Sequence, residues 1–248
     1  MNINQYVHKL VQTLEPSPFG IYQYGSGAIG AFNKEQSDWD LIIFFHSEDD
    51  LLQLTPQIQM FHDTIRHTYP EFYHRLDVMF LPISAHGKGN GDVSPYPSLE
   101  GGSFASASYH NLNAVTWWTL RTSWYGPELL PAVTMDDVME EMKYNLTHYW
   151  PHYIAKGQQA DADGEEIVWV VSGLARILYT VECHDIIGKE SALDWARKMM
   201  PEHQEIIDEA IQLRRGKKSF VLADSAMKAQ VLQFADQAIE LGQRKLNL

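Results

Sequence analysis

The sequence predicts an α/β (α+β) N-terminal domain with a small mixed sheet over residues 1–133, followed by an all-α helical bundle over residues 134–248. Two observations carry this prediction. Short apolar runs of strand length, bounded by turn residues, occur in the first half at residues 19–24, 40–45 and 76–81. Beyond Pro131 the apolar residues recur only at helical spacing. With 248 residues, the chain is long enough for two domains of ordinary size.

The remaining elements of the first domain follow from spacing and from turn residues. Apolar residues three or four apart predict an amphipathic helix over residues 2–14, which Pro16 and Pro18 end. A serine followed by three acids favours a helix start, and a stretch with five glycines and two prolines favours a loop. The expected elements are therefore a helix from Ser47 to about His67, a long loop from Ser84 to Ser103, and a helix over residues 107–121.

The second domain is expected to contain helices only. Thr134 offers an N-cap with acids in the turn behind it, so a helix is expected from there to about Trp150. Apolar spacing predicts the others at residues 165–183, 190–199, 202–215 and 221–244.

The net charge and the cysteine content of the chain limit the kinds of binding partner and of cellular location that are expected. The net charge is −13, from 19 basic and 32 acidic residues, whereas a protein that grips nucleic-acid backbone shows a basic field. A small or cationic acceptor is therefore expected, with no nucleic-acid and no membrane partner. Cys183 is the only cysteine, which excludes an internal disulfide and favours a cytoplasmic location. Cys183 itself is expected to be a buried, small apolar residue.

The stretch from Gly25 to Asp40 carries the chemistry. Gly25-Ser26 follows an apolar run directly, and a glycine there lets backbone N–H groups approach phosphate closely. Asp38 and Asp40 are two residues apart, so on an extended backbone both carboxylates face one side. Two neighbouring carboxylates favour a cation between them, and Mg²⁺ arrives with substrate phosphates. This pattern predicts a site for a metal-nucleotide, although a surface turn with two solvated aspartates is the plain alternative.

Asp77 is the candidate for a third acid, because it is the single charged residue in an otherwise apolar strand. Gly-Ser, then Asp-x-Asp on the next strand, then a later acid, resembles the signature of the DNA polymerase β-like nucleotidyltransferase superfamily. The second half adds Leu174-Ala175-Arg176-Ile177-Leu178-Tyr179 and Gly188-Lys189 through Trp195-Ala196. These segments, with Tyr125-Gly126-Pro127 before them, resemble the aminoglycoside adenylyltransferases that act on streptomycin and spectinomycin.

The resemblance implies a role for each matching residue. Gly25, Ser26 and Ser37, with Lys189, would bind the nucleotide. Asp38 and Asp40 would bind Mg²⁺, with two ions expected and ATP as co-substrate. Asp77 falls where the family has a glutamate that acts as catalytic base, and being one methylene shorter it is either that base or a further metal ligand.

The acceptor is the least determined part. An aminoglycoside hydroxyl is expected from the resemblance, and Glu166 is the first candidate to bind it, from a group of acids that includes Asp161, Asp163 and Glu165. A solvated helix face explains these acids equally well. The family's Gly-Glu-Trp segment is missing and residues 167–171 are apolar, so another small hydroxylated acceptor stays open. A non-catalytic nucleotide-binding module, antitoxin-like or regulatory, is the alternative function.

Overall fold

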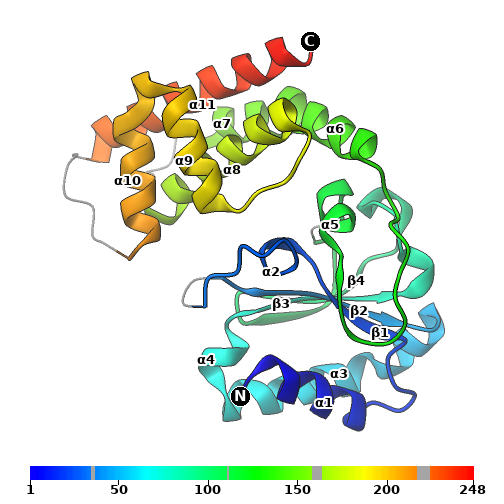
Figure 1. The fold of residues 1–248 in the computed structure, drawn as a ribbon. Helices are drawn as coiled ribbons and strands as arrows, with labels where there is room; N and C mark the ends of the chain where they lie inside the picture. The colour runs from blue at the N-terminus through cyan, green and yellow to red at the C-terminus, as the bar shows by residue number, and fades with distance from the viewer. Residues whose placement is uncertain (35–36, 111, 158–163, 217–223) are drawn as a thin grey trace. The chain divides into compact units, whose positions relative to one another are not determined.

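The computed structural model describes residues 1–34, 37–110, 112–157, 164–216 and 224–248. The chain divides into two compact units, Met1–Thr134 and Met135–Leu248 (Figure 1). The first unit combines a sheet with helices, and in the described part of the second unit every regular element is a helix. The predicted fold class, an α/β half followed by a helical half, is confirmed.

The first unit is built on a six-stranded mixed sheet with the strand order β5-β4-β3-β2-β1-β6. The central pair, β2 and β3, is parallel, and the other neighbouring pairs are antiparallel. The strands are β1 (Gly20–Gln23), β2 (Trp39–Phe45), β3 (Leu76–Pro82), β4 (Tyr96–Glu100), β5 (Ser103–Ser108) and β6 (Thr122–Tyr125).

Both faces of the central strands are covered, which explains their continuous apolar runs. Leu41, Ile43 and Phe45 of β2 pack with α1 (Ile3–Thr13) and α3 (Glu48–Thr68) on one face. Ile42 and Phe44 face the other way and pack with the segment that contains α5 (Ala114–Thr119). Figure 1 shows α1 and α3 under the sheet, and α2 (Gly25–Ala28) with α5 above it. A short helix α4 (Pro70–Tyr73) links α3 to β3.

Local signals in the sequence account for these helix starts. Asn2 and Gln5 form a reciprocal capping box at α1, in which each side chain accepts a hydrogen bond from the other's backbone N–H. Ser47 caps α3 by accepting from the N–H of Asp50, and three acids lie in its first turn. The expected helices over residues 2–14 and from Ser47 to about His67 therefore form close to their predicted bounds.

The second unit packs its helices around α8, which carries ten buried residues. Its elements are α6 (Met135–Tyr144), a π-helical turn (Asn145–Tyr149), α7 (Trp150–Gly157), α8 (Gly164–Cys183), α9 (Lys189–Met199), α10 (Gln204–Arg214) and α11 (Asp224–Lys245). Gly173 on α8 lets the Trp150 ring approach the helix closely, because a Cβ there would meet that ring at 2.8 Å. Within the described parts of the chain, no helix is long and apolar enough to cross a membrane.

Three expectations were wrong. The stretch from Ser84 to Ser103, expected to be a loop, contains β4 and the start of the β4–β5 hairpin. Residues 107–121 contain only the six-residue helix α5, because β5 occupies the beginning of that range. Cys183, expected to be buried, is exposed at the end of α8.

Candidate active site

The predicted acids Asp40 and Asp77 lie side by side on adjacent parallel strands. Asp40 of β2 is the register partner of Asp77 of β3. Side chains alternate along a strand, so Asp40 shares the face of Ile42 and Phe44, and Asp77 shares the face of Met79. Both carboxylates are therefore on the sheet face that bears α5. Two like charges in this position repel each other unless a cation or a donor lies nearby.

A third carboxylate extends this row. Val78 pairs with Leu99 and Met79 with Ser98 between β3 and β4, so the register carried one residue further puts Glu100 opposite Asp77. Asp40, Asp77 and Glu100 thus come from three neighbouring strands and one face. The Glu100 side chain is 65% exposed and that of Asp77 is 20% exposed. Glu100 is an acid that the sequence reading did not single out.

Gly25 lies against this row at the end of β1. Its φ is +63°, and a Cβ there would collide with the carboxylate of Asp40, with the Asp40 Cγ at 3.1 Å. The Gly25 N–H donates to the hydroxyl of Thr119 at 3.0 Å, and the Tyr24 N–H donates to the Asp40 carbonyl at 3.0 Å. Gly25 and Ser26 form the first turn of the four-residue helix α2. The Gly-Ser turn and Asp40, predicted to share a site, are therefore neighbours.

Asp38 lies one residue before β2, at the end of a turn that Arg75 fixes. The Arg75 guanidinium donates to the carbonyls of Ser37, through Nε at 3.1 Å and through Nη2, and of Lys34 at 2.8 Å. Ser37 is buried, and its hydroxyl oxygen accepts from the Asn33 N–H at 2.9 Å. In this structure Ser37 therefore closes the turn that leads to Asp38, and its predicted contact with a nucleotide stays a prediction.

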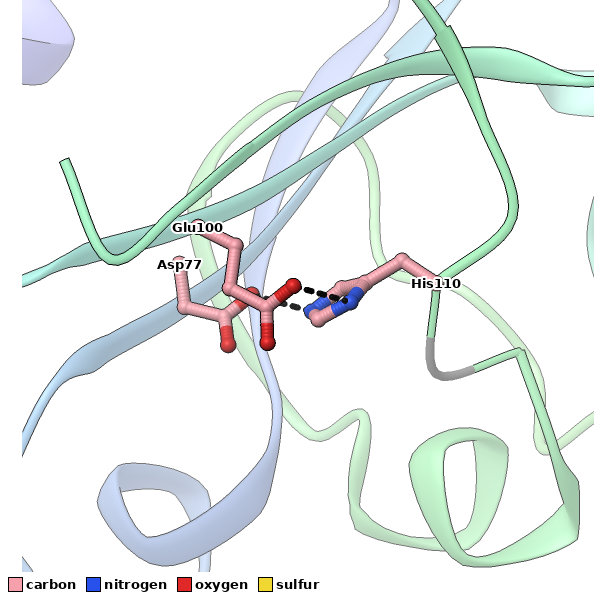
Figure 2. A group of neighbouring side chains, drawn as sticks. All are labelled: Asp77, Glu100 and His110. Atoms are coloured by element: carbon pink, nitrogen blue, oxygen red, sulfur yellow. Dashed lines mark hydrogen bonds and ion pairs between the residues drawn. The ribbon is translucent and has the colours of Figure 1, made fainter. Parts of the chain in front are cut away.

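Asp77 is held by two further side chains (Figure 2). Nε2 of His110 lies 2.8 Å from Asp77 Oδ1, and Nδ1 of the same ring lies 3.3 Å from Glu100 Oε2. The Tyr24 hydroxyl donates to Asp77 Oδ1 at 3.3 Å. His110 follows β5 in the chain, so the β4–β5 hairpin delivers both Glu100 and His110 to the predicted third acid.

The acids shift the pKa values of these two neighbours. Burial raises the pKa of Tyr24 well above its ordinary value, and the charges of Asp77 and Asp40 raise it further, so Tyr24 is a neutral donor. Burial lowers the pKa of His110, but the hydrogen bond and charge of Asp77, with the charges of Glu100 and Asp40, outweigh burial, and the net shift is upward. A raised pKa favours the charged imidazolium, which offsets part of the repulsion in the row.

The residues present fit a divalent cation. Carboxylate oxygens are the ligands that Mg²⁺ prefers, and Asp40 and Asp77 offer them as register partners, with Asp38 two residues before Asp40 at the start of β2. The paired register of Asp40 and Asp77 is the observation that favours a cation, because it brings like charges together. Among the described residues, Asp77, Glu100 and His110 are the group of possible ligands that lies closest together, with one ligand atom from each within 4.8 Å of the others.

The other two predicted residues belong to the second unit. Lys189 is the first residue of α9, after Gly188 as N-cap. Glu166 lies in the first turn of α8, where its Oε1 accepts from the Tyr153 hydroxyl at 2.8 Å. Asp161 and Asp163, named with Glu166 as acids for a cationic acceptor, lie outside the described residues.

A comparison with protein-family models finds a match for the second half of the chain. Residues 128–240, a little under half of the chain, match the family model for the C-terminal domain of aminoglycoside adenylyltransferases. The chain is similar to the aminoglycoside adenylyltransferases. The resemblance seen in the sequence is thereby confirmed, and the match supports the assignment as a nucleotidyltransferase enzyme.

The fold extends this likeness beyond the family match. The spectinomycin adenyltransferase AAD(9) from Enterococcus faecialis, solved with ATP and spectinomycin, superposes with a TM-score of 0.61 and 14% sequence identity. The alignment covers 95% of this chain and 98% of that one, so the aminoglycoside adenylyltransferase fold runs through both units. No curated protein matches the chain in sequence.

Proposed function

We propose that the chain is a Mg²⁺-dependent adenylyltransferase that moves AMP from ATP to a hydroxyl of an aminoglycoside-like acceptor. One observation carries the proposal: Asp40 and Asp77 are register partners on one face of the sheet, and Gly25 lies directly against Asp40. A degenerate nucleotide-binding module has no need to keep two acids in repulsive contact beside a phosphate turn. The family match over residues 128–240 supports the same reading.

Each predicted site residue of the first unit has a proposed role in binding ATP or Mg²⁺. Gly25 and Ser26 approach the ATP phosphates with backbone N–H groups, because no Cβ at residue 25 bars the way. Asp38 and Asp40 would hold Mg²⁺, two ions by analogy with other two-metal phosphoryl-transfer sites, and Asp77 would be either the catalytic base or a further metal ligand. When bound, Mg²⁺ supplies charge neutralisation on the phosphate oxygens. The protein's own contribution is positioning and a fixed electrostatic field.

The proposed reaction transfers one group and one proton. The acceptor hydroxyl oxygen forms a bond to the α-phosphorus of ATP, and the bond from that phosphorus to the β-phosphate oxygen breaks, releasing pyrophosphate. The hydroxyl proton passes to the Asp77 carboxylate, which is within the acid row and 20% exposed. Asp77 is proposed as the base because it lies beside Asp40 on the neighbouring strand, and the donors from His110 and Tyr24 meet its Oδ1, so Oδ2 is the oxygen proposed to accept the proton.

The proposed acceptor is cationic. The chain carries a net charge of −13, and Glu166 with its Tyr153 partner offers a carboxylate beside aromatic rings on the second unit. Lys189, the only basic residue in the first turn of α9, is proposed to meet the ATP triphosphate. The relative AAD(9) was solved with spectinomycin, which makes aminocyclitols the first compounds to try.

The test is to incubate the protein with ATP, Mg²⁺ and single aminoglycosides, and to look by mass spectrometry for an acceptor carrying one added AMP. Asp38→Asn and Asp40→Asn are expected to lower turnover at least 100-fold, because each removes a metal-ligating charge at nearly constant volume. Asp49→Asn is the charge-matched control: Asp49 is an exposed acid at the start of α3, the helix on the opposite face of the sheet.

Three outcomes decide between the candidates. An AMP adduct that Asp40→Asn abolishes and Asp49→Asn preserves supports the proposed function. Pyrophosphate release with a different hydroxylated acceptor, and none with any aminoglycoside, overturns the drug assignment alone. ATP binding by calorimetry without pyrophosphate release across a broad acceptor panel favours the non-catalytic module.

A further inference from the structure

We infer that His110 is a positioning residue for Asp77: the imidazole, which also lies within ion-pair distance of Glu100, fixes the orientation of the carboxylate that acts in the transfer. The inference rests on the proposed function, because it concerns the group proposed as base or metal ligand. Three features of the structure support it: the contacts of the His110 ring, the contacts of the His110 backbone, and the register of the three strands.

The His110 ring contacts acids of two strands. An ionised carboxylate only accepts, so the 2.8 Å contact between His110 Nε2 and Asp77 Oδ1 is a donation from the ring. The opposite ring nitrogen lies 3.3 Å from Glu100 Oε2, so the imidazole bridges acids of two neighbouring strands. Figure 2 shows both contacts reaching one ring from the same side of the sheet. The His110 side chain is only 7% exposed, which limits its movement.

The His110 backbone is held as firmly as its ring. Its N–H donates to the Tyr96 hydroxyl at 2.8 Å, and its carbonyl accepts from the side-chain amide of Asn90. The Tyr96 hydroxyl in turn donates to Asn90 Oδ1 at 3.0 Å, which closes a ring of three hydrogen bonds. A side chain fixed at both ends can impose a rotamer on its neighbour, whereas a mobile one cannot.

The His110 ring restricts the orientation of the Asp77 carboxylate. Its Oδ1 receives two hydrogen bonds, from His110 and from the Tyr24 hydroxyl. Rotation of the carboxylate would break both, so the two oxygens become inequivalent and Oδ2 is assigned to the cation or to the acceptor proton. Glu100 acts one step further out, because its Oε2 lies 3.3 Å from Nδ1 of the imidazole and not against Asp77 Oδ1.

The decisive variants are His110→Phe and His110→Gln. Phe keeps the planar ring and its packing but removes both nitrogens, whereas Gln keeps one N–H donor at about the reach of Nε2. His110→Phe is expected to lower kcat by about 10- to 100-fold, the usual effect of losing a residue that orients a reacting group, with KM for ATP within about twofold. His110→Gln is expected to recover part of the loss, and Glu100→Gln to show a smaller loss than His110→Phe.

His86→Phe is the matched control. His86 is a partly buried histidine of the same unit, whose ring packs edge-on against Phe44 and Trp117 at 5.9 and 5.5 Å. The change removes an imidazole and keeps ring packing, as His110→Phe does, but away from the acid row. Its kcat is expected to stay within about twofold of the wild type, as for surface or packing-neutral changes.

A readout independent of activity is the NMR signal of the His110 ring nitrogens in the free protein. Asp77→Asn is expected to shift Nε2, and Glu100→Gln is expected to shift Nδ1. If neither signal moves, or if His110→Phe leaves kcat unchanged, the inference is overturned. If Mn²⁺ alone binds to the wild type and His110→Phe abolishes that binding, the ring is a metal ligand, and the inference is overturned as well.

Failure of the proposed function gives a different pattern. A wild-type protein that transfers no AMP to any acceptor refutes the adenylyltransferase proposal directly. The ring-nitrogen shifts remain measurable in that case, and they decide by themselves whether His110 holds Asp77 in solution.

Discussion

At the scale of single residues, Gly25 meets two requirements at once. Its backbone has a positive φ of +63°, which residues with a Cβ adopt at a cost of about 1–2 kcal/mol. Its missing side chain also leaves room for the Asp40 carboxylate, which any Cβ would displace. Gly30, five residues on, has a φ of +74° and no atom of the described residues within 4 Å of a Cβ built there. A substitution at Gly30 therefore introduces backbone strain alone, whereas one at Gly25 also crowds the Asp40 carboxylate.

Gly25→Ala and Gly30→Ala form a matched pair for this reason. Each is expected to lower the free energy of unfolding by about 1–2 kcal/mol through the left-handed backbone. Only Gly25→Ala is expected to lower AMP transfer, by more than about tenfold, because only it moves Asp40. Chemical denaturation measures the first quantity and steady-state kinetics the second. Equal kcat values in the two variants would contradict the proposed contact between the phosphate turn and Asp40.

His62 gives the first unit a titratable group in its packed layer of helices. The Tyr6 hydroxyl of α1 contacts His62 Nε2 at 2.9 Å, and Nδ1 of the same ring contacts the Ile58 carbonyl at 2.7 Å. A carbonyl only accepts, so Nδ1 carries the proton and Nε2 accepts from Tyr6, which requires a neutral ring. Burial lowers the pKa of His62 to about 4 from the ordinary 6.5.

This pKa predicts a loss of stability in mild acid. Between pH 6.5 and pH 4 the unfolded chain binds a proton at this residue and the folded chain does not, so stability falls as pH falls through that window. The loss from His62 is about 2 kcal/mol between pH 7 and pH 5. Urea denaturation at both pH values should show a smaller difference for His62→Gln than for the wild type. His67→Gln, at an exposed histidine of the same helix, should keep the wild-type difference.

At the scale of elements, the sequence predicted those with a strong local signal. The expected helix over residues 165–183 is observed as Gly164–Cys183, because its apolar spacing and following turn are both local. The β4–β5 hairpin was missed because its residues include Pro97, Gly101 and Gly102, which read as loop. Pairing with β3 makes β4 a strand, and that partner is about twenty residues away in the chain.

The missed hairpin explains the missed part of the candidate site. Asp40 and Asp77 could be found because each lies in a buried apolar run, where a charge is conspicuous. Glu100 and His110 lie at the ends of two short strands with polar faces, so neither stands out. Tyr96, Ser98 and Leu99 are all buried, so β4 is covered on both faces, and the serine and proline in it hide the apolar run that marks β2 and β3.

At the scale of the whole molecule, the proposed chemistry is divided between the two units. The acid row and the phosphate turn belong to Met1–Thr134, whereas Lys189 and Glu166 belong to Met135–Leu248. The likeness in fold to AAD(9) covers 95% of the chain and therefore includes both units. Lys189 is the residue of the second unit with the most specific proposed role, which is contact with the ATP triphosphate.

Lys189→Gln is expected to raise KM for ATP by about 10- to 100-fold, since a lost contact to a charged group costs about 1.5–3 kcal/mol. Lys198→Gln is the control: it makes the same charge change near the other end of α9, at an exposed residue in the last turn. Its KM should match the wild type, and melting temperatures should be equal for both variants. Steady-state kinetics with ATP varied at saturating acceptor makes the comparison. If the two variants raise KM equally, the effect is one of net charge, and Lys189 does not contact the triphosphate.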